Sequence, residues 1–146
     1  MWSAWLDSDM PILPKTENSL LVRTSFADEK AWLDALSVVL TENEDGFRAY
    51  VEVIDDNAWE NADWERLRET AREAENQAAV LFVVDHAALE PDYPILVVDL
   101  DQVSRQPFRC VARELWGVDN NLNLANMDWE DFAESADTDS VFRGFA

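Results

Sequence analysis

Four oxygen-bearing side chains in the stretch VDNNLNLANMDWEDF, residues 118–132, have nearly the spacing of a calcium-binding loop. They are Asp119, Asn121, Asn123 and, eleven residues after the first, Glu130. The match is incomplete, because such a loop needs glycine at its sixth position, which is Leu124 here. The alternative is that the asparagines bond to local backbone and that Asp128 caps a helix beginning at Trp129. We favour this alternative and expect a short buried strand or a packed turn, with Leu122 and Leu124 buried, before a capped helix.

A second group of candidate residues follows two expected strands. It consists of Asp55, Asp56, Asp85 and His86. Ligands of open α/β sheets bind beyond the carboxyl ends of parallel strands, and gathered carboxylates there could hold Mg²⁺. A magnesium-dependent enzyme that uses the three aspartates therefore stays open. The alternative is that these residues only end strands and cap helices, so we assign no catalytic residue, metal or cofactor.

Other catalytic chemistry has little support in the sequence. The chain has only three glycines, which leaves no glycine-rich loop to cradle a phosphate, and it contains no paired-cysteine or HExxH metal motif. Cys110 lies in the middle of an expected strand, where a small buried residue fits. His86 is the only histidine.

Three of the seven tryptophans, Trp59, Trp116 and Trp129, do not follow a clear helical spacing. Exposed tryptophan on an acidic surface would be a candidate for protein binding. Large aromatic side chains are mostly buried, so packing of the C-terminal helices against the sheet is the alternative.

The elements that must position these residues can be read from apolar spacing. Strands are expected at 19–26, 47–56, 79–87, 94–101 and 108–112, and helices at 28–40, 64–74, 113–118 and 128–136. The gap between the third and fourth strands is too short for a parallel crossover, so these strands should be antiparallel. The sequence thus predicts an N-terminal arm (1–18) and a single three-layer α/β domain (19–146). Its order is β-α-β-α-β-β-β-α-α, with a mixed sheet of about five strands.

Net charge is the most unusual property of the chain. Eleven Lys and Arg face 31 Asp and Glu, which gives −20, and the acids are spread along the whole length. Such a protein repels nucleic acid and anionic membrane, so we expect it to bind neither directly. The lone cysteine and the absence of a signal-peptide pattern or a long apolar run predict a cytoplasmic protein.

Several segments together resemble a known family. They are LLVRTSFADEKAWLDAL, DGFRAYVEVIDD, LFVVDHAAL, ILVVDLD, RELWGVDNNLNLANMDWEDFAESAD and VFRGF. The chain is similar to a family of small acidic proteins, mainly actinobacterial, that is catalogued as a domain of unknown function. The family more often has glycine where this chain has Ser140. The resemblance covers about residues 19–145 and implies a cytosolic bacterial protein. It implies no activity, cofactor or catalytic residue.

The sequence favours a binding protein that engages a basic protein partner, with an immunity or antitoxin-like role as the concrete version. A nucleic-acid mimic that sequesters a DNA-binding protein is the second hypothesis. The magnesium-dependent enzyme is the third, and a charge that serves solubility alone is the fourth.

Overall fold

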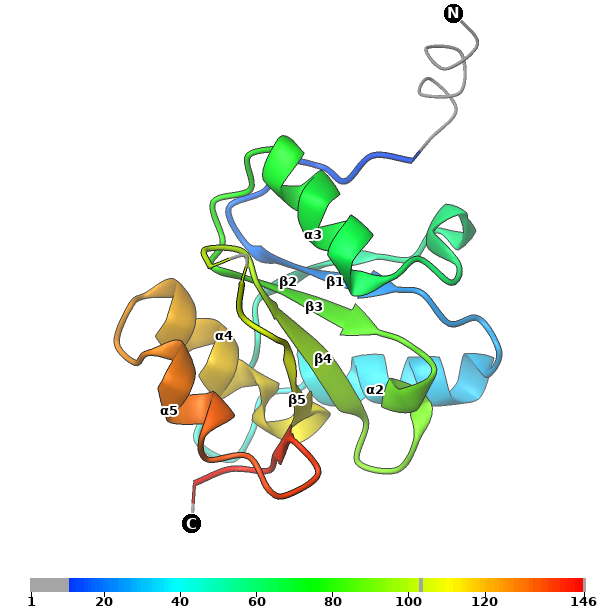
Figure 1. The fold of residues 1–146 in the computed structure, drawn as a ribbon. Coiled ribbons are helices and arrows are strands. Elements are labelled where there is room, and N and C mark those ends of the chain that lie inside the picture. The colour runs from blue at the N-terminus through cyan, green and yellow to red at the C-terminus, as the bar shows by residue number, and fades with distance from the viewer. Residues whose placement is uncertain (1–10, 103, 146) are drawn as a thin grey trace, which may run out of the picture.

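Six strands form one mixed sheet in the computed structural model of the chain, which describes residues 11–102 and 104–145 (Figure 1). The strands are β1 (Ser19–Arg23), β2 (Val51–Ile54), β3 (Val80–Val84), β4 (Pro94–Asp99), β5 (Phe108–Val111) and β6 (Val141–Phe142). Their order across the sheet is β2-β1-β3-β4-β5-β6. β1 is parallel to β2 and β3, whereas β4 is antiparallel to β3 and β5, and β6 is parallel to β5. The carboxyl ends of β1, β2 and β3 therefore lie at one end of the sheet.

Helices cover both faces of this sheet. They are α2 (Glu29–Leu40), α3 (Trp64–Glu73), α4 (Leu115–Asn123) and α5 (Trp129–Ala133), with short 3-10 turns η1 (Asn57–Trp59), η2 (Ala87–Leu89) and η3 (Ala112–Glu114). α3 lies on one face, and α2, α4 and α5 lie on the other (Figure 1). α2 joins β1 to β2 and α3 joins β2 to β3, because a parallel connection must cross the sheet. In the described part of the chain, no helix has the length and apolarity needed to cross a bilayer.

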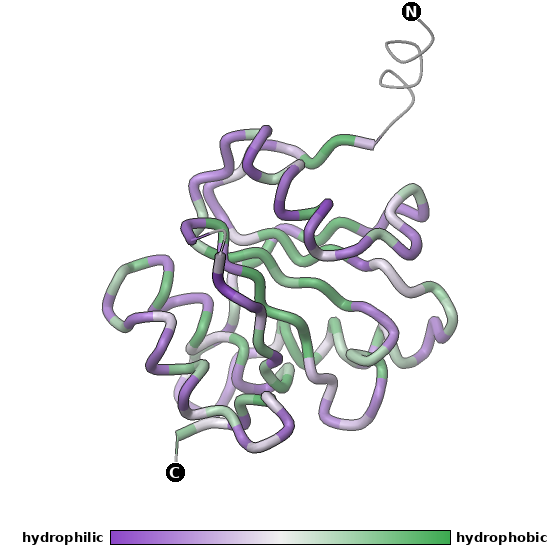
Figure 2. The backbone as a smooth tube through the Cα atoms, in the orientation of Figure 1, coloured by the Kyte–Doolittle hydropathy of each residue, from purple (hydrophilic) through white to green (hydrophobic). Residues whose placement is uncertain are grey.

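Each face of the sheet has its own hydrophobic core. In β3, Phe82 and Val84 pack on the side of α2 and α4, whereas Leu81 and Val83 pack on the side of α3. Every residue of β3 is buried, which explains its continuous apolar sequence. Figure 2 shows the apolar residues concentrated in these central strands.

Aspartates begin the main helices. Asp28 Oδ1 accepts a hydrogen bond from Ala31 N at 3.0 Å at the start of α2, and Asp63 Oδ1 accepts one from Arg66 N at 2.8 Å at the start of α3. Asp128 forms a capping box with Asp131 at the start of α5, as the sequence predicted for Asp128. Part of the acidic composition is therefore architectural, since these carboxylates satisfy backbone N–H groups that a helix leaves unpaired.

The predicted α/β fold with a mixed sheet is confirmed, with three differences. The expected strand 47–56 begins only at Val51, because the Tyr50 N–H donates to a side chain of α4 and not to a neighbouring strand. β6 was not predicted, because two residues carry no periodicity. The expected helix 113–118 becomes η3 and α4, and α4 continues to Asn123 through the stretch that we expected to be a turn.

The predicted N-terminal arm is only partly described. Trp2 and Trp5 lie outside the described residues. Within 11–18 there is no helix or strand, but Leu13 is buried in the core beneath α3. Thr16 N donates to Asn76 Oδ1 at 2.6 Å, so this segment is attached to the end of the α3 connection.

Candidate functional site

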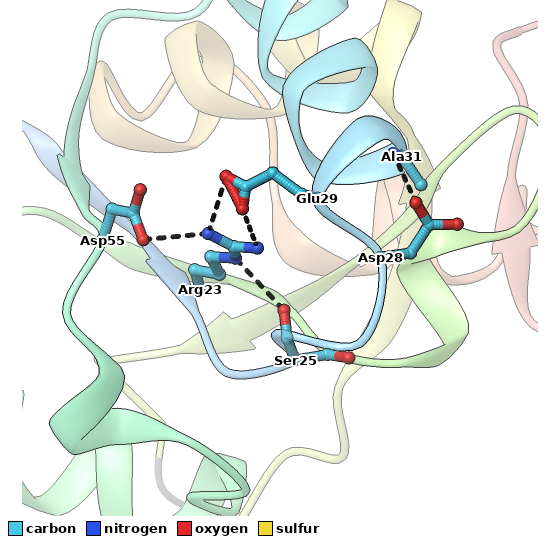
Figure 3. Close-up of polar contacts among 6 residues, drawn as sticks. All are labelled: Arg23, Ser25, Asp28, Glu29, Ala31 and Asp55. Carbon is cyan, nitrogen blue, oxygen red and sulfur yellow. Dashed lines mark hydrogen bonds and ion pairs between the residues drawn. The ribbon is translucent and has the colours of Figure 1, made fainter.

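A buried arginine joins the carboxyl ends of β1 and β2 (Figure 3). The guanidinium of Arg23, the last residue of β1, donates from Nη1 to Asp55 Oδ1 at 3.2 Å and from Nη2 to Glu29 Oε2 at 2.8 Å. Its Nε donates to the carbonyl oxygen of Ser25 at 3.2 Å. A charge taken out of water costs several kcal/mol unless it is paired and hydrogen-bonded. Asp55 therefore serves as a counter-ion of Arg23.

Two aromatic rings complete the surroundings of this arginine. The guanidinium carbon of Arg23 lies 4.2 Å from the centre of the Phe26 ring and 5.0 Å from that of Trp32. Such contacts stabilise a desolvated cation by about 2 kcal/mol. Our sequence analysis missed Arg23, although an arginine inside the apolar run SLLVRTSF was a visible signal.

Asp85, at the end of β3, belongs to a separate arginine cluster. Arg109 of β5 reaches across β4 and donates to both carboxylate oxygens of Asp85, at 2.9 and 2.7 Å. The same guanidinium donates to the Pro94 carbonyl oxygen at 3.0 Å, and Asp85 Oδ1 accepts from Ala88 N at 3.2 Å. A bidentate pair of this kind holds both side chains in one geometry.

The other two strand-end candidates have different roles. Asp56 Oδ1 accepts a hydrogen bond from Ala58 N at 2.9 Å and caps η1. His86 is exposed just before η2 and makes no side-chain capping bond. Across residues 11–102 and 104–145, no three His, Cys, Asp or Glu side chains gather in a way that could hold a metal ion. The geometry therefore gives no support to a shared magnesium site of Asp55, Asp56 and Asp85.

The stretch resembling a calcium loop begins within α4, where the buried Asp119 forms a polar network. Asp119 Oδ2 accepts from Tyr50 N at 3.0 Å, and Asp119 Oδ1 accepts from Asn123 Nδ2 at 2.8 Å. Asn123 also donates to Ser19 Oγ at 2.9 Å and accepts from Ala79 N at 2.8 Å. Burial raises the pKa of Asp119, and its hydrogen bonds from Tyr50, Ser19 and Asn123 oppose that rise. The network fastens α4 to the starts of β1 and β3.

This network gives the calcium interpretation no support. The ligand atoms of Asp119 and Asn123 are already hydrogen-bonded, and Glu130 Oε1 accepts from Arg105 Nη2 at 2.7 Å. Asn121 Nδ2 donates back to the Gly117 carbonyl oxygen at 2.8 Å. The expectation that the asparagines bond to local backbone holds for Asn121 but only in part for Asn123, which also bonds to the distant Ser19 and Ala79. Both asparagines lie within a helix and not within a turn, and Leu124, which we expected to be buried, is 69% exposed.

A family model for a domain of unknown function, DUF6924, matches residues 18–145. The chain belongs to the DUF6924 family. The family resemblance proposed from the sequence is therefore confirmed. No curated protein matches the chain.

Two of the three candidate tryptophans are core residues of the DUF6924 domain. Trp59 is 2% exposed and packs beneath α3, and Trp129 is 7% exposed. The Trp129 ring meets that of Phe108 edge to face, with centroids 4.7 Å apart. The prediction that Trp59 and Trp129 could form an exposed binding surface does not hold in this structure, because each side chain fills an apolar core.

Trp116 is the candidate tryptophan that reaches the surface of the DUF6924 domain. It is half-buried at the start of α4, and its ring stacks on Phe47 with centroids 5.0 Å apart and planes 10° apart. Phe47 is 48% exposed. Phe47 lies before the first residue of β2, in the part of the expected strand 47–56 that is not a strand.

Cys110 is fully buried in β5, as predicted. Burial raises the pKa of its thiol well above the ordinary value, so the thiol stays protonated at neutral pH. Because the thiolate is the reactive form, Cys110 is unsuited to nucleophilic chemistry.

Proposed function

We propose that this DUF6924 domain is a non-enzymatic, cytoplasmic binding protein that engages a basic protein partner through its acidic surface. The observation that supports the proposal is that every Lys and Arg side chain already contacts a group of the same protein. There are eleven of them against 31 acidic residues. Any further positive charge for the acidic surface must therefore come from another molecule or from ions in solution.

The internal partners of the cations are of two kinds. Seven form ion pairs with carboxylates: Lys15, Arg23, Lys30, Arg105, Arg109, Arg113 and Arg143. Arg48, Arg66, Arg68 and Arg72 contact an aromatic ring or a backbone carbonyl oxygen. Among residues 11–102 and 104–145, most carboxylates take part in no ion pair.

An uncompensated surface of this kind favours capture of a cationic protein. The summed field of the carboxylates accelerates encounter with a basic partner and rejects acidic ones. The same field repels duplex DNA and anionic membrane, which need cationic contacts on the protein. An immunity or antitoxin-like inhibitor of a basic protein is the concrete form of the proposal.

Two other functions would explain the charge or the strand-end acids differently. A nucleic-acid mimic fits the total charge, since B-DNA as long as the roughly 38 Å domain carries about 22 charges. The acids are dispersed along the whole chain, however, whereas a mimic needs them ordered along one face. A magnesium-dependent enzyme is less favoured, because Asp55 and Asp85 bind two different arginines.

The proposal is tested by isolating the partner from the host with the full chain as bait and then measuring binding between the two purified proteins. We expect a basic partner whose association rate falls about tenfold or more between 0.02 M and 0.15 M NaCl, because salt screens the steering field. The DUF6924 protein alone should show no affinity for duplex DNA. A partner with no excess of Lys and Arg, or a rate independent of salt, would contradict the proposal.

Competition then separates an inhibitor from a mimic. Duplex DNA added to the preformed complex should leave an immunity-type complex intact, since the two need not share a surface. Displacement by DNA would instead favour the mimic. Hydrolysis or group transfer that requires Mg²⁺ and is lost in Asp85→Asn would favour the enzyme.

A further inference from the structure

A stacked aromatic pair joins the loop between α2 and β2 to the start of α4. The pair is Phe47 and Trp116, and together with the exposed Tyr50 of the same loop we call it the aromatic platform. Phe47 and Tyr50 are 48% and 50% exposed, and the Phe47 ring stacks on Trp116 at 5.0 Å. Tryptophan and tyrosine are the residue types, together with arginine, that most often dominate binding energy at protein interfaces.

Hydrogen bonds within the loop before β2 hold the platform in place. Asn43 N donates to the Phe47 carbonyl oxygen at 2.8 Å, and the Asn43 carbonyl oxygen accepts from Gly46 N at 3.0 Å. Asn43 Oδ1 accepts from Asp45 N at 2.9 Å and from Phe47 N at 3.0 Å. Gly46 has a φ of +84°, which glycine adopts without strain. One asparagine therefore fixes the whole turn that leads into the platform.

The other end of the platform is fixed as well. The Tyr50 N–H donates to the buried carboxylate of Asp119 in α4, the helix that also carries Trp116. Because both ends are held, the platform loses little conformational freedom when a partner binds. Such preorganisation raises affinity.

Three exposed acids border the platform in the turn fixed by Asn43. They are Glu42, Glu44 and Asp45. In the described part of the chain none of the three forms an ion pair. The turn that leads to Phe47 therefore offers negative charge with which a bound cation can pair.

Several aromatic rings of the protein are covered by its own arginine side chains. Arginines lie over the rings of Phe26, Tyr50, Trp59 and Trp64, at 4.2, 4.4, 5.9 and 4.9 Å from the centroids. Among residues 11–102 and 104–145, no cation lies over the stacked pair of Phe47 and Trp116. Planar guanidinium stacks on aromatic faces better than ammonium does.

We infer that the aromatic platform docks an arginine-containing segment of the basic partner. The guanidinium packs on the exposed ring surface beside Phe47, and Glu42 and Glu44 neutralise its charge. This inference rests on the proposed function and adds the surface and the chemistry of recognition. The partner contacts the loop before β2 and not the acidic surface in general.

The probes are three nine-residue peptides with glycine spacers, carrying four arginines, four lysines or four citrullines. Binding to the full-length protein is followed by ¹⁵N amide and tryptophan indole NMR shifts at 0.02 M NaCl. We expect saturable shifts at Phe47, Tyr50 and the Trp116 indole. The arginine peptide should bind at least threefold more tightly than the lysine peptide, and the citrulline peptide should not bind.

Substitutions at the platform should weaken the arginine peptide selectively. Phe47→Ser should raise its Kd about tenfold, the change that corresponds to loss of a hot spot of about 1.4 kcal/mol. Phe47→Tyr keeps the ring and should bind normally, and amide shifts of Phe47→Ser that match the wild type outside the loop exclude misfolding as the cause. Ile12→Ser is the matched control, because Ile12 is 84% exposed beside α3 on the opposite face of the sheet.

The acids are tested in the same way. Glu44→Gln should weaken the arginine peptide more than Glu69→Gln, which removes an exposed charge from α3. If the peptide shifts residues elsewhere and Phe47→Ser binds normally, the inference is wrong and the proposed function stands. If no cationic peptide binds at 0.02 M NaCl and no basic partner is isolated, the inference and the proposed function are both wrong.

Discussion

Many aspartates of this protein serve backbone groups rather than a reaction. Asp28 and Asp63 cap helices, and Asp99 Oδ1 accepts from Asp101 N at 2.8 Å and Gln102 N at 3.1 Å in the turn after β4. Each carboxylate satisfies N–H groups that would otherwise lie unpaired at the end of an element. The acidic composition is thus partly a consequence of how the chain ends its strands and begins its helices.

Asp119 is the carboxylate on which the packing of α4 most depends. In Asp119→Ala, Tyr50 N–H and Asn123 Nδ2 lose an acceptor in a partly buried site, so we expect a loss of about 1 to 3 kcal/mol. Urea unfolding followed by circular dichroism measures this change. Asn121→Ala, on the same helix, removes only the bond to Gly117 and should cost less than about 1 kcal/mol. Equal effects of the two substitutions would contradict this role for Asp119.

Asp119 also gives the stability a definite dependence on pH. Its pKa in the folded protein is raised by burial, so the folded state binds this proton at a higher pH than the unfolded state does. Stability from this group is therefore present at low pH and decreases as pH rises from about 4 through the raised pKa. The difference in unfolding free energy between the wild type and Asp119→Ala should shrink across that window. A difference that grows with pH would contradict the direction of the shift.

Among the secondary-structure elements, the sequence correctly predicted those whose apolar residues recur at a regular local spacing. The strands around Leu21 and Phe82 and the helix α2 have uninterrupted apolar spacing, so their type and mutual direction were correct. α4 was mistaken in part for a turn, because its asparagines are held by partners as distant as Ser19 and Ala79. The arginine clusters at the strand ends were missed for the same reason. Long-range pairing leaves no local pattern in a sequence.

The turn before β6 contains a non-glycine residue in a strained backbone conformation. Ser140 has a φ of +65°, a conformation that costs a non-glycine residue roughly 1 kcal/mol. Glycine adopts a positive φ of this kind without a steric penalty. Ser140→Gly should therefore raise the free energy of unfolding by about 0.5 to 1 kcal/mol in chemical denaturation, less any added flexibility of the unfolded chain.

Gly144 supplies the matched control for that substitution. It has a φ of +106°, and a Cβ at this position would meet Glu114 Oε1. Gly144→Ala should therefore destabilise the protein by about 1 kcal/mol or more, opposite in sign to Ser140→Gly. Destabilisation by Ser140→Gly would mean that the serine side chain contributes more than its backbone strain costs.

At the scale of the whole molecule, the ion pairs only partly offset the charge. The arginine clusters around Arg23 and Arg109 lie at the ends of the parallel strands, whereas pairs such as Lys30–Asp34 are exposed and contribute little. Folding brings the remaining carboxylates closer together than they are in the unfolded chain. The fold is therefore held by its two apolar cores against a substantial self-repulsion.

Screening this repulsion should stabilise the protein. Raising NaCl from 0.01 M to 0.15 M shortens the Debye length from about 30 Å to about 8 Å, so we expect the melting temperature to rise. Differential scanning calorimetry without the partner measures this rise. CaCl₂ at matched ionic strength should give no site-specific increase, because the carboxylates of Asp119 and Glu130 are engaged by Asn123 and Arg105. A calcium-specific increase that Glu130→Gln abolishes would restore the calcium interpretation. A melting temperature that falls as NaCl is raised would mean that the attraction within the ion pairs outweighs the repulsion among the carboxylates.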